Sequence, residues 1–140
     1  MVTHLLEAAM SDLHAVIDRM GQGWLGDPAA MDELLAEDVV MEVPFAPGGP
    51  LRWDGREEWL AFAVPSRAGF PARFDRFTKL AVHETLDPEV AVVEYELGGV
   101  VTTTGQRAAA RFIGVLRVRD GKIAGWREYQ DTYAIRQALG

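Results

Sequence analysis

From Phe74 to Gln130 the chain alternates hydrophobic and polar residues with a period of two. This alternation is typical of β-strands that bury one face, and few folds accommodate so much of it. Four consecutive strand candidates read FDRFTKLAVHETL, EVAVVEYELGGVVTT, AARFIGVLRV and KIAGWREYQ. The dipeptide Asp120-Gly121 separates the last two, and Asp-Gly between strands favours a two-residue hairpin turn. We predict an antiparallel meander over this part of the chain.

The N-terminal part has helical spacing instead. Between Leu6 and Met20 apolar residues recur at intervals of three and four, and Gly21 and Gly23 are expected to end this first helix. Further helices are predicted at about 28–37, 56–64 and 133–139, with a strand at 39–45. Pro65 is expected to end the helix at 56–64. Helices followed by a meander predict an α+β fold, a cone-shaped half-barrel in which N-terminal helices pack on a curved antiparallel sheet.

Composition restricts the class of protein and of partner. With 140 residues, 49% of them hydrophobic, the chain can bury an ordinary core as one domain, residues 1–140. Its 14 basic and 21 acidic side chains give a net charge of −7, and no run of Lys or Arg is present, so nucleic acid is not an expected partner. Lacking cysteine, it has no disulfide or thiolate metal site, and its three histidines lack metal-ligand spacing. With no signal peptide or membrane span evident, we expect a cytoplasmic protein without metal.

Hairpin arithmetic predicts which residues share a face of the sheet. If Arg119 pairs with Lys122, then Glu128 lies opposite Ile113, and opposed side chains share a face. The Asp87-Pro88 turn, treated in the same way, places Ala81 opposite Glu94 and His83 opposite Val92, and Glu96 is expected near Arg111. One predicted face carries the polar set Lys79, His83, Glu94, Glu96, Arg111, Trp126, Glu128 and Gln130. The other carries Leu80, Val82, Val93, Tyr95, Leu97, Phe112, Leu116, Ile123 and Tyr129.

Two arrangements of these faces are open. In the first, the apolar face packs against the helices, and Glu128 and His83 are solvated surface residues. In the second, the polar face lines a cavity under the helices. The apolar face is then covered by a second copy, because an exposed apolar face of that size is a liability in a monomer.

The C-terminal segment FIGVLRVRDGKIAGWREYQDTYAIRQAL resembles the closing hairpin and helix of the nuclear transport factor 2-like superfamily, which includes ketosteroid isomerase, SnoaL-like polyketide cyclases and limonene epoxide hydrolase. Within it, GKIAGWREYQD is similar to the epoxide hydrolase pattern G-K-I-x-x-W-R-D-Y-F-D, and the segment also looks like the phenazine-biosynthesis A/B proteins. Upstream, DPAAMDELLAEDVVMEVPFAPGGPLRWDGREEWLAF resembles the helix-strand-helix that opens these domains. The resemblance covers almost the whole chain and implies a single SnoaL-like domain.

The resemblance also implies a site. Glu128 falls where these enzymes keep an acid/base carboxylate, and Trp126 falls on an aromatic that lines the pocket, which places the polar face inward. His83 and Arg111 are candidate catalytic helpers beside Glu128, although His83 as a structural donor and Arg111 as an ion-pair partner stay open. The further candidates for substrate binding are Glu94, Glu96, Trp59, Phe62 and Trp24.

One departure from the resemblance affects the expected reaction. The epoxide hydrolases use an Arg-x-Asp pair on an earlier strand, where the nearest match in this chain is Glu94-Tyr95-Glu96. We therefore expect a cofactor-independent acid/base enzyme of the isomerase or cyclase type that acts on a hydrophobic small molecule, with a homodimer formed through the outer sheet face. The alternatives are a non-catalytic ligand-binding module and an epoxide hydrolase with a rearranged site.

Overall fold

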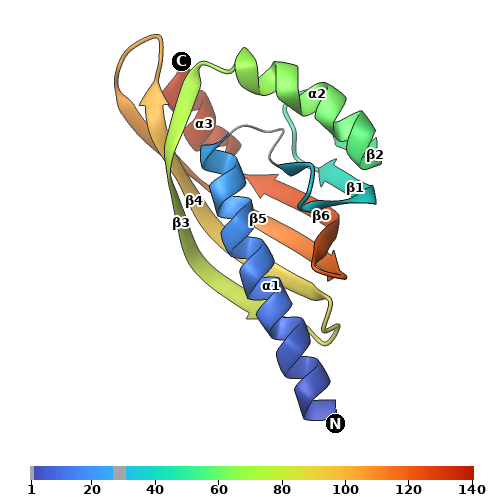
Figure 1. Cartoon of the computed structure of the whole chain (residues 1–140). Coiled ribbons are helices and arrows are strands. Elements are labelled where there is room, and N and C mark those ends of the chain that lie inside the picture. The colour runs from blue at the N-terminus through green and yellow to red at the C-terminus, as the bar shows by residue number, and fades with distance from the viewer. Residues whose placement is uncertain (1, 27–30) are drawn as a thin grey trace.

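The computed structural model describes residues 2–26 and 31–140, and in this part of the chain it has three helices and one six-stranded sheet. The elements in chain order are α1 (Val2–Leu25), β1 (Leu35–Val43), β2 (Leu51–Asp54), α2 (Arg56–Ala68), β3 (Ala72–Glu84), β4 (Val90–Val101), β5 (Arg107–Arg119), β6 (Lys122–Gln130) and α3 (Thr132–Leu139). The predicted α+β class, with helices gathered on a curved sheet, is confirmed (Figure 1).

The strands lie in the order β2-β1-β6-β5-β4-β3. Strands β3 to β6 form the predicted antiparallel meander, and β1 joins it in parallel beside β6. The sheet is curved and does not close, since β2 and β3 remain its two edges (Figure 1). Helix α1 lies along the concave side, whereas α2 and α3 lie at the end of the sheet near the C-terminus of α1. This arrangement covers one end of the concave side with three helices.

The first helix extends beyond the predicted stop. Gly21 and Gly23 lie inside α1, which continues to Leu25, so the prediction that they end it is wrong. Both glycines mark places where a neighbouring side chain packs against the helix backbone. A Cβ atom at Gly21 would lie 2.5 Å from the ring of Phe77, and one at Gly23 would collide with the sulfur of Met31. Close packing, and not termination, explains the two glycines.

The second predicted helix, at 28–37, is wrong wherever the structure describes it. Residues 28–30 lie outside the described part, residues 31–34 form a turn, and Leu35 already begins β1. Leu34 and Leu35 are buried, and the carbonyl oxygen of Leu34 accepts a hydrogen bond from the N–H of Ile123 in β6. In this segment, hydrogen bonding to β6 determines the backbone conformation in place of the helix that the spacing of apolar residues predicts. The four-residue edge strand β2 has no counterpart in the prediction.

Helix α2 starts at Arg56 as predicted but passes Pro65 and ends at Ala68. A proline in a helix removes one N–H donor, and in the last turn this costs a single hydrogen bond. The turn is closed instead by the N–H of Gly69, which donates to the carbonyl oxygen of Pro65 at 3.1 Å. The expectation that Pro65 ends the helix is therefore wrong by one turn.

The hairpin between β5 and β6 begins in the predicted register and then changes it. Arg119 pairs with Lys122 as expected, but Arg117 pairs with Gly125. Ala124 is therefore an extra residue in β6, which is the definition of a β-bulge. A shift of one residue moves every later side chain of a strand to the opposite face.

The bulge decides the position of the residues that carry the resemblance. Glu128 pairs with Gly114 and Trp126 with Leu116, so both share a face with the apolar residues of β4 and β5. The prediction that Glu128 lies opposite Ile113, with Trp126 on the same polar face, is wrong. The register predicted for the β3–β4 turn, by contrast, is confirmed for Ala81–Glu94 and His83–Val92, as is the Glu96–Arg111 pair.

The inner, concave face of the sheet is the apolar one. It carries Tyr95, Leu97, Phe112, Leu116 and Trp126, all buried, and α1 packs against it through Leu13, Val16, Ile17 and Met20. The apolar face thus finds its cover within one chain, contrary to the second arrangement considered above. Dimerisation through the outer face stays a prediction.

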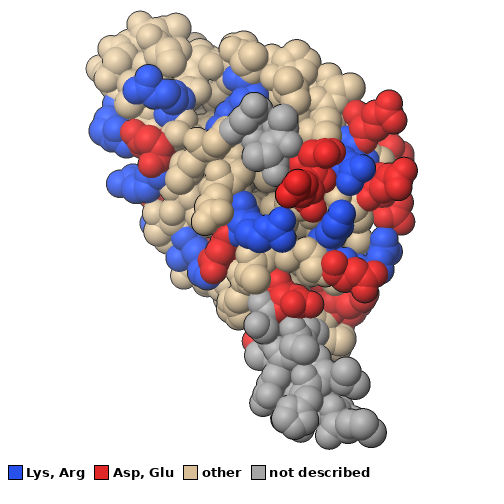
Figure 2. Space-filling model, viewed as in Figure 1, with Lys and Arg blue, Asp and Glu red and all other residues tan. Residues whose placement is uncertain are grey.

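Charged side chains lie mostly outside this core. On the face seen in Figure 2, Lys and Arg stand beside Asp and Glu and do not form a separate basic patch. Exposed ion pairs link strands that have one strand between them in the sheet, such as Arg107 of β5 with Asp75 of β3 and Arg119 of β5 with Asp38 of β1. Pairs of this kind contribute little to stability, at most about 1 kcal/mol each. Over the described residues, no helix has the length and apolar character needed to cross a membrane.

Candidate active site

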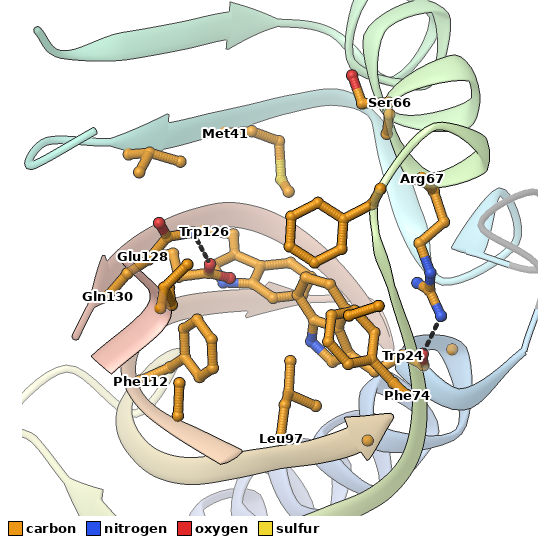
Figure 3. A pocket seen from close by; sticks show the side chains of 18 of the residues that line it. Trp24, Met41, Ser66, Arg67, Phe74, Leu97, Phe112, Trp126, Glu128 and Gln130 are labelled. Carbon is orange, nitrogen blue, oxygen red and sulfur yellow. Dashed lines mark hydrogen bonds between the residues drawn. The ribbon is translucent and has the colours of Figure 1, made fainter. Parts of the chain in front are cut away.

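A cavity of about 330 Å³ opens between the sheet, α2, α3 and the C-terminal end of α1. It exists because the inner face of β5 changes along the strand from bulky to small residues. Phe112 and Leu116 pack under α1, whereas Ala110 and Ala108, nearer the start of β5, leave space above them. Most of the other lining side chains are aromatic or aliphatic (Figure 3). Such a cavity favours an apolar ligand.

Glu128 projects from β6 into this apolar environment and is only 7% exposed. Its Oε2 accepts a hydrogen bond from the Tyr95 hydroxyl at 2.9 Å. Its Oε1 accepts one from the Gln130 amide at 2.8 Å (Figure 3). Burial raises the pKa of Glu128 above the ordinary 4.5, although the hydrogen bonds from Gln130 and Tyr95 act in the opposite direction. A carboxyl with a raised pKa is suited to exchanging protons near neutral pH.

Tyr95 reaches Glu128 from β4, two strands away in the sheet order. Its ring is fully buried and lies between the rings of Phe77 and Phe112, with both centroid distances at 5.3 Å. Burial raises the pKa of Tyr95 well above 10, and the neighbouring Glu128 carboxylate raises it further. The hydroxyl therefore keeps its proton and acts as a donor toward Glu128.

The predicted aromatic residues do line the cavity. Trp24, Trp59, Phe62 and Trp126 all belong to its wall, with Trp126 almost completely buried and Phe62 45% exposed at the rim. The rings of Trp24 and Trp126 meet edge to face at 6.1 Å. The buried indole N–H of Trp126 has no hydrogen-bond partner among the described residues. The indole N–H of Trp24 interacts with the Tyr95 hydroxyl and lowers its pKa, against the larger effects of burial and Glu128. Both tryptophans give the cavity wall a broad apolar surface.

Arg67 of α2 is the only Lys or Arg in the cavity wall that the structure describes. Its Nη2 donates to the backbone carbonyl oxygen of Trp24 and, at 3.4 Å, to that of Gly26 (Figure 3). The guanidinium also lies over the rings of Phe74 and Trp24, 5.0 and 5.8 Å from their centroids. Arg67 thus ties the end of α2 to the end of α1 and holds Trp24 at the cavity.

Four sequence candidates lie elsewhere. His83 Nε2 lies 2.6 Å from Glu94 Oε2, and Arg111 Nε donates to Glu96 Oε2 at 3.3 Å, both pairs on the outer face of the sheet. None of these residues belongs to the cavity wall. The prediction that they share a face with Glu128 is wrong, because the bulge at Ala124 moves Glu128 to the inner face while they remain outside.

Two polar residues of the site, Tyr95 and Gln130, have no role in the sequence-based prediction. Tyr95 was assigned to the apolar face, correctly, but alternation says nothing of what a tyrosine hydroxyl reaches across two strands. Gln130 is two residues from Glu128 and so lies on the same face in any register. One signal was available for the bulge: Ile123 and Trp126, both large and apolar, are three residues apart, and regular alternation would place them on opposite faces.

Comparison with known proteins supports the same fold. The SnoaL-like domain model matches residues 17–126. The uncharacterized PhzA/B-like protein PA3332 of Pseudomonas aeruginosa is 36% identical over 118 residues, which are 82% of this chain and 80% of that protein. Among solved structures, a Bacillus subtilis protein provisionally classed as an isomerase superposes with a TM-score of 0.81 at 24% identity, covering 94% of this chain and 95% of its own.

A more distant neighbour is an LEH-like epoxide hydrolase of M. tuberculosis, with a TM-score of 0.68 at 18% identity, covering 92% of this chain and 90% of its own. Structural likeness at such identity concerns the fold, which hosts several chemistries. The family model, however, spans more than half of the chain, and the relative from Pseudomonas aeruginosa supports it. The chain belongs to the family of SnoaL-like domains.

Proposed function

We propose that the protein is a cofactor-independent acid/base enzyme of the isomerase or cyclase type, in which Glu128 moves a proton on a hydrophobic small molecule. One observation carries the proposal: a buried carboxyl with a raised pKa forms part of the wall of an otherwise apolar cavity. A carboxyl is costly to bury without a cation, and perturbed carboxyls in cavities are frequent at functional sites. The classes named for the structural neighbours, an isomerase and a polyketide cyclase, are compatible with this chemistry.

The mechanism follows from the position of the groups. An apolar substrate fills the cavity with an acidic C–H bond against Glu128, and the ionised carboxyl removes that proton. The resulting enolate then takes the proton back from Glu128 at another atom. Alternatively, its carbon attacks a carbonyl carbon of the same molecule, and Glu128 gives the proton to the alkoxide that forms. A positioned acid or base contributes about 10²- to 10⁴-fold in rate, and neither step requires a metal or an organic cofactor. Trp126 and Trp24 exclude water from the reacting atoms.

Two alternatives have less support. Epoxide hydrolysis of the limonene epoxide type needs a cation between two carboxylates, whereas the hydrogen-bond partners of Glu128 are Tyr95 and Gln130. Arg111, the cation predicted from the sequence as a catalytic helper beside Glu128, lies on the outer face. A non-catalytic binding module uses the same cavity, and it differs from the enzyme in having no need for an exchangeable proton on Glu128.

The proposal is tested by proton exchange on a model ketone. 2-Tetralone, an apolar bicyclic ketone with acidic α-protons, is incubated with the protein in D₂O, and deuterium incorporation is followed by ¹H NMR. We expect exchange above the buffer rate for the natural chain and loss of at least tenfold in Glu128→Gln, with 2-tetralone affinity retained. The control is Glu96→Gln, an outer-face carboxylate whose replacement leaves exchange unchanged. Equal exchange by Glu128→Gln and the natural chain would refute the assignment.

A further inference from the structure

The two oxygens of the Glu128 carboxyl have different surroundings. Oε2 accepts from Tyr95, a fully buried residue that is not part of the cavity wall. Oε1 accepts from Gln130, which lines the cavity together with Glu128 itself. One oxygen is thus held by a residue outside the cavity wall, and the other is held by a residue of that wall, a contact drawn in Figure 3.

The hold on Oε2 is rigid. The Tyr95 ring is stacked between Phe77 of β3 and Phe112 of β5, and backbone pairing on both sides of β4 fixes the strand that carries it. The hydroxyl has one proton, and that proton is directed at Oε2 across 2.9 Å. As long as Tyr95 donates, Oε2 is favoured as the carbonyl oxygen of the protonated carboxyl, because the hydroxyl oxygen of a carboxylic acid is the weaker acceptor.

The partner of Oε1 is adaptable. The side-chain amide of Gln130 has a donor NH₂ and an acceptor oxygen, which exchange places when the amide rotates by half a turn. Gln130 is partly buried and lies two residues along β6 from Glu128. It can therefore donate to an ionised Oε1 and accept from a protonated one. The Tyr95 hydroxyl could accept a hydrogen bond from a protonated Oε2 only if it stopped donating its own proton to that oxygen.

We propose that Tyr95 is a positioning residue that keeps Oε2 an acceptor and so directs the exchangeable proton of Glu128 to Oε1, the oxygen on the cavity side. This deepens the proposed function and rests on it for its chemical purpose, since a proton on Oε2 would be out of reach of a ligand. The location of the proton is nevertheless a property of the free protein. It can be measured without any substrate.

The first test is a titration of Glu128 by ¹³C NMR of the glutamate side-chain carboxyl carbons, in the natural chain and in Tyr95→Phe. The substitution keeps the stacked ring and removes the hydroxyl. We expect the pKa of Glu128 to rise by about 1 pH unit or more, because the ionised form loses a hydrogen bond. The control is Tyr129→Phe on the outer face, where the ring contacts Phe45, and it should leave the titration unchanged. An unaltered pKa in Tyr95→Phe would overturn the proposal.

The second test locates the proton by difference infrared spectroscopy of the protonated carboxyl, using ¹³C-labelled glutamate. If the proton is on Oε1, the carbonyl oxygen is Oε2, and the C=O stretch moves to higher wavenumber when Tyr95→Phe removes its donor. A stretch at the same wavenumber in both proteins would mean that the carbonyl oxygen is Oε1, which contradicts the proposal.

A third measurement covers the case in which Tyr95→Phe does not fold. Replacing all three tyrosines by 3-fluorotyrosine makes the hydroxyl a stronger donor with little change in shape. The pKa of Glu128 should then fall, and a constant or higher value counts against the role of Tyr95. Failure of these measurements leaves the exchange experiment with Glu128→Gln unaffected, so the two proposals stand or fall separately.

Discussion

Filling the cavity should stabilise the protein and remove its ligand site. Ala110 pairs with Leu97 on the inner face and lies in the cavity wall, where β5 leaves space under α2 and α3. In Ala110→Leu, three added carbon atoms enter a cavity of about 330 Å³ that holds no protein atoms. Burying one methylene group contributes about 0.8 kcal/mol, so the upper limit for the substitution is about 2.4 kcal/mol. Rotamer restriction and imperfect contacts reduce this, and we expect a gain of about 1 kcal/mol in the free energy of unfolding.

The assay combines urea unfolding with ligand binding. The unfolding midpoint of Ala110→Leu should increase at constant slope, and affinity for 2-tetralone should fall at least tenfold. The matched control is Ala61→Leu, an exposed position on α2 outside the cavity wall, for which neither quantity should change by much. If Ala110→Leu is destabilised while it still binds 2-tetralone as tightly as the natural chain, the space above β5 is not the ligand site.

Three further outcomes are expected. Gly99→Ala should destabilise by about 1–3 kcal/mol in urea unfolding, because its Cβ would collide with a backbone carbonyl of β3, whereas Gly114→Ala makes ordinary contacts and should be nearly neutral. Asp131→Ala removes the side-chain cap of α3 and should cost about 1 kcal/mol by the same assay, with weaker 2-tetralone binding because α3 lines the cavity. The raised pKa of Glu128 means that the folded state binds more protons than the unfolded state. The free energy of unfolding should therefore fall as pH rises from the ordinary glutamate pKa of 4.5 through the higher pKa of the folded protein. Glu128→Gln should lack this decline, and parallel stability curves between about pH 4 and 8 would contradict the shift.

The parts of the fold that follow from the sequence are those in which local pattern and tertiary contact agree. Alternation places all four strands of the meander, and Asp120-Gly121 sets the correct first pair of the last hairpin. The helices are placed less well, since a glycine that ends a helix and a glycine that admits a neighbouring ring look alike in sequence. Gly21 is of the second kind, because its function depends on Phe77, more than fifty residues away.

The position of Glu128 in the cavity wall agrees with the resemblance, whereas the face of the sheet predicted for it is wrong. The resemblance placed Glu128 in a pocket, and strict alternation then carried His83, Glu94, Glu96 and Arg111 with it. A single extra residue at Ala124 separates Glu128 from all four. The only local signal of the bulge is Gly125 beside it, because a glycine inside a strand often marks a bulge. Only the position of the large apolar side chains on either side, which must both be buried, requires it.

The strongest argument for a function at Glu128 is energetic and does not depend on relatives. In an ion pair on the outer face, such as Arg111 with Glu96, the charges stay in contact with solvent, which lowers the cost of keeping them ionised. Glu128 has two neutral donors, Tyr95 and Gln130, and its pKa is raised, so the folded state bears a cost whenever the group ionises. A glutamine at this position would satisfy the Tyr95 hydroxyl without that cost. A site that must release and accept a proton requires a carboxyl at this position. A wall with a purely structural role does not require one, because the amide would serve it at lower cost.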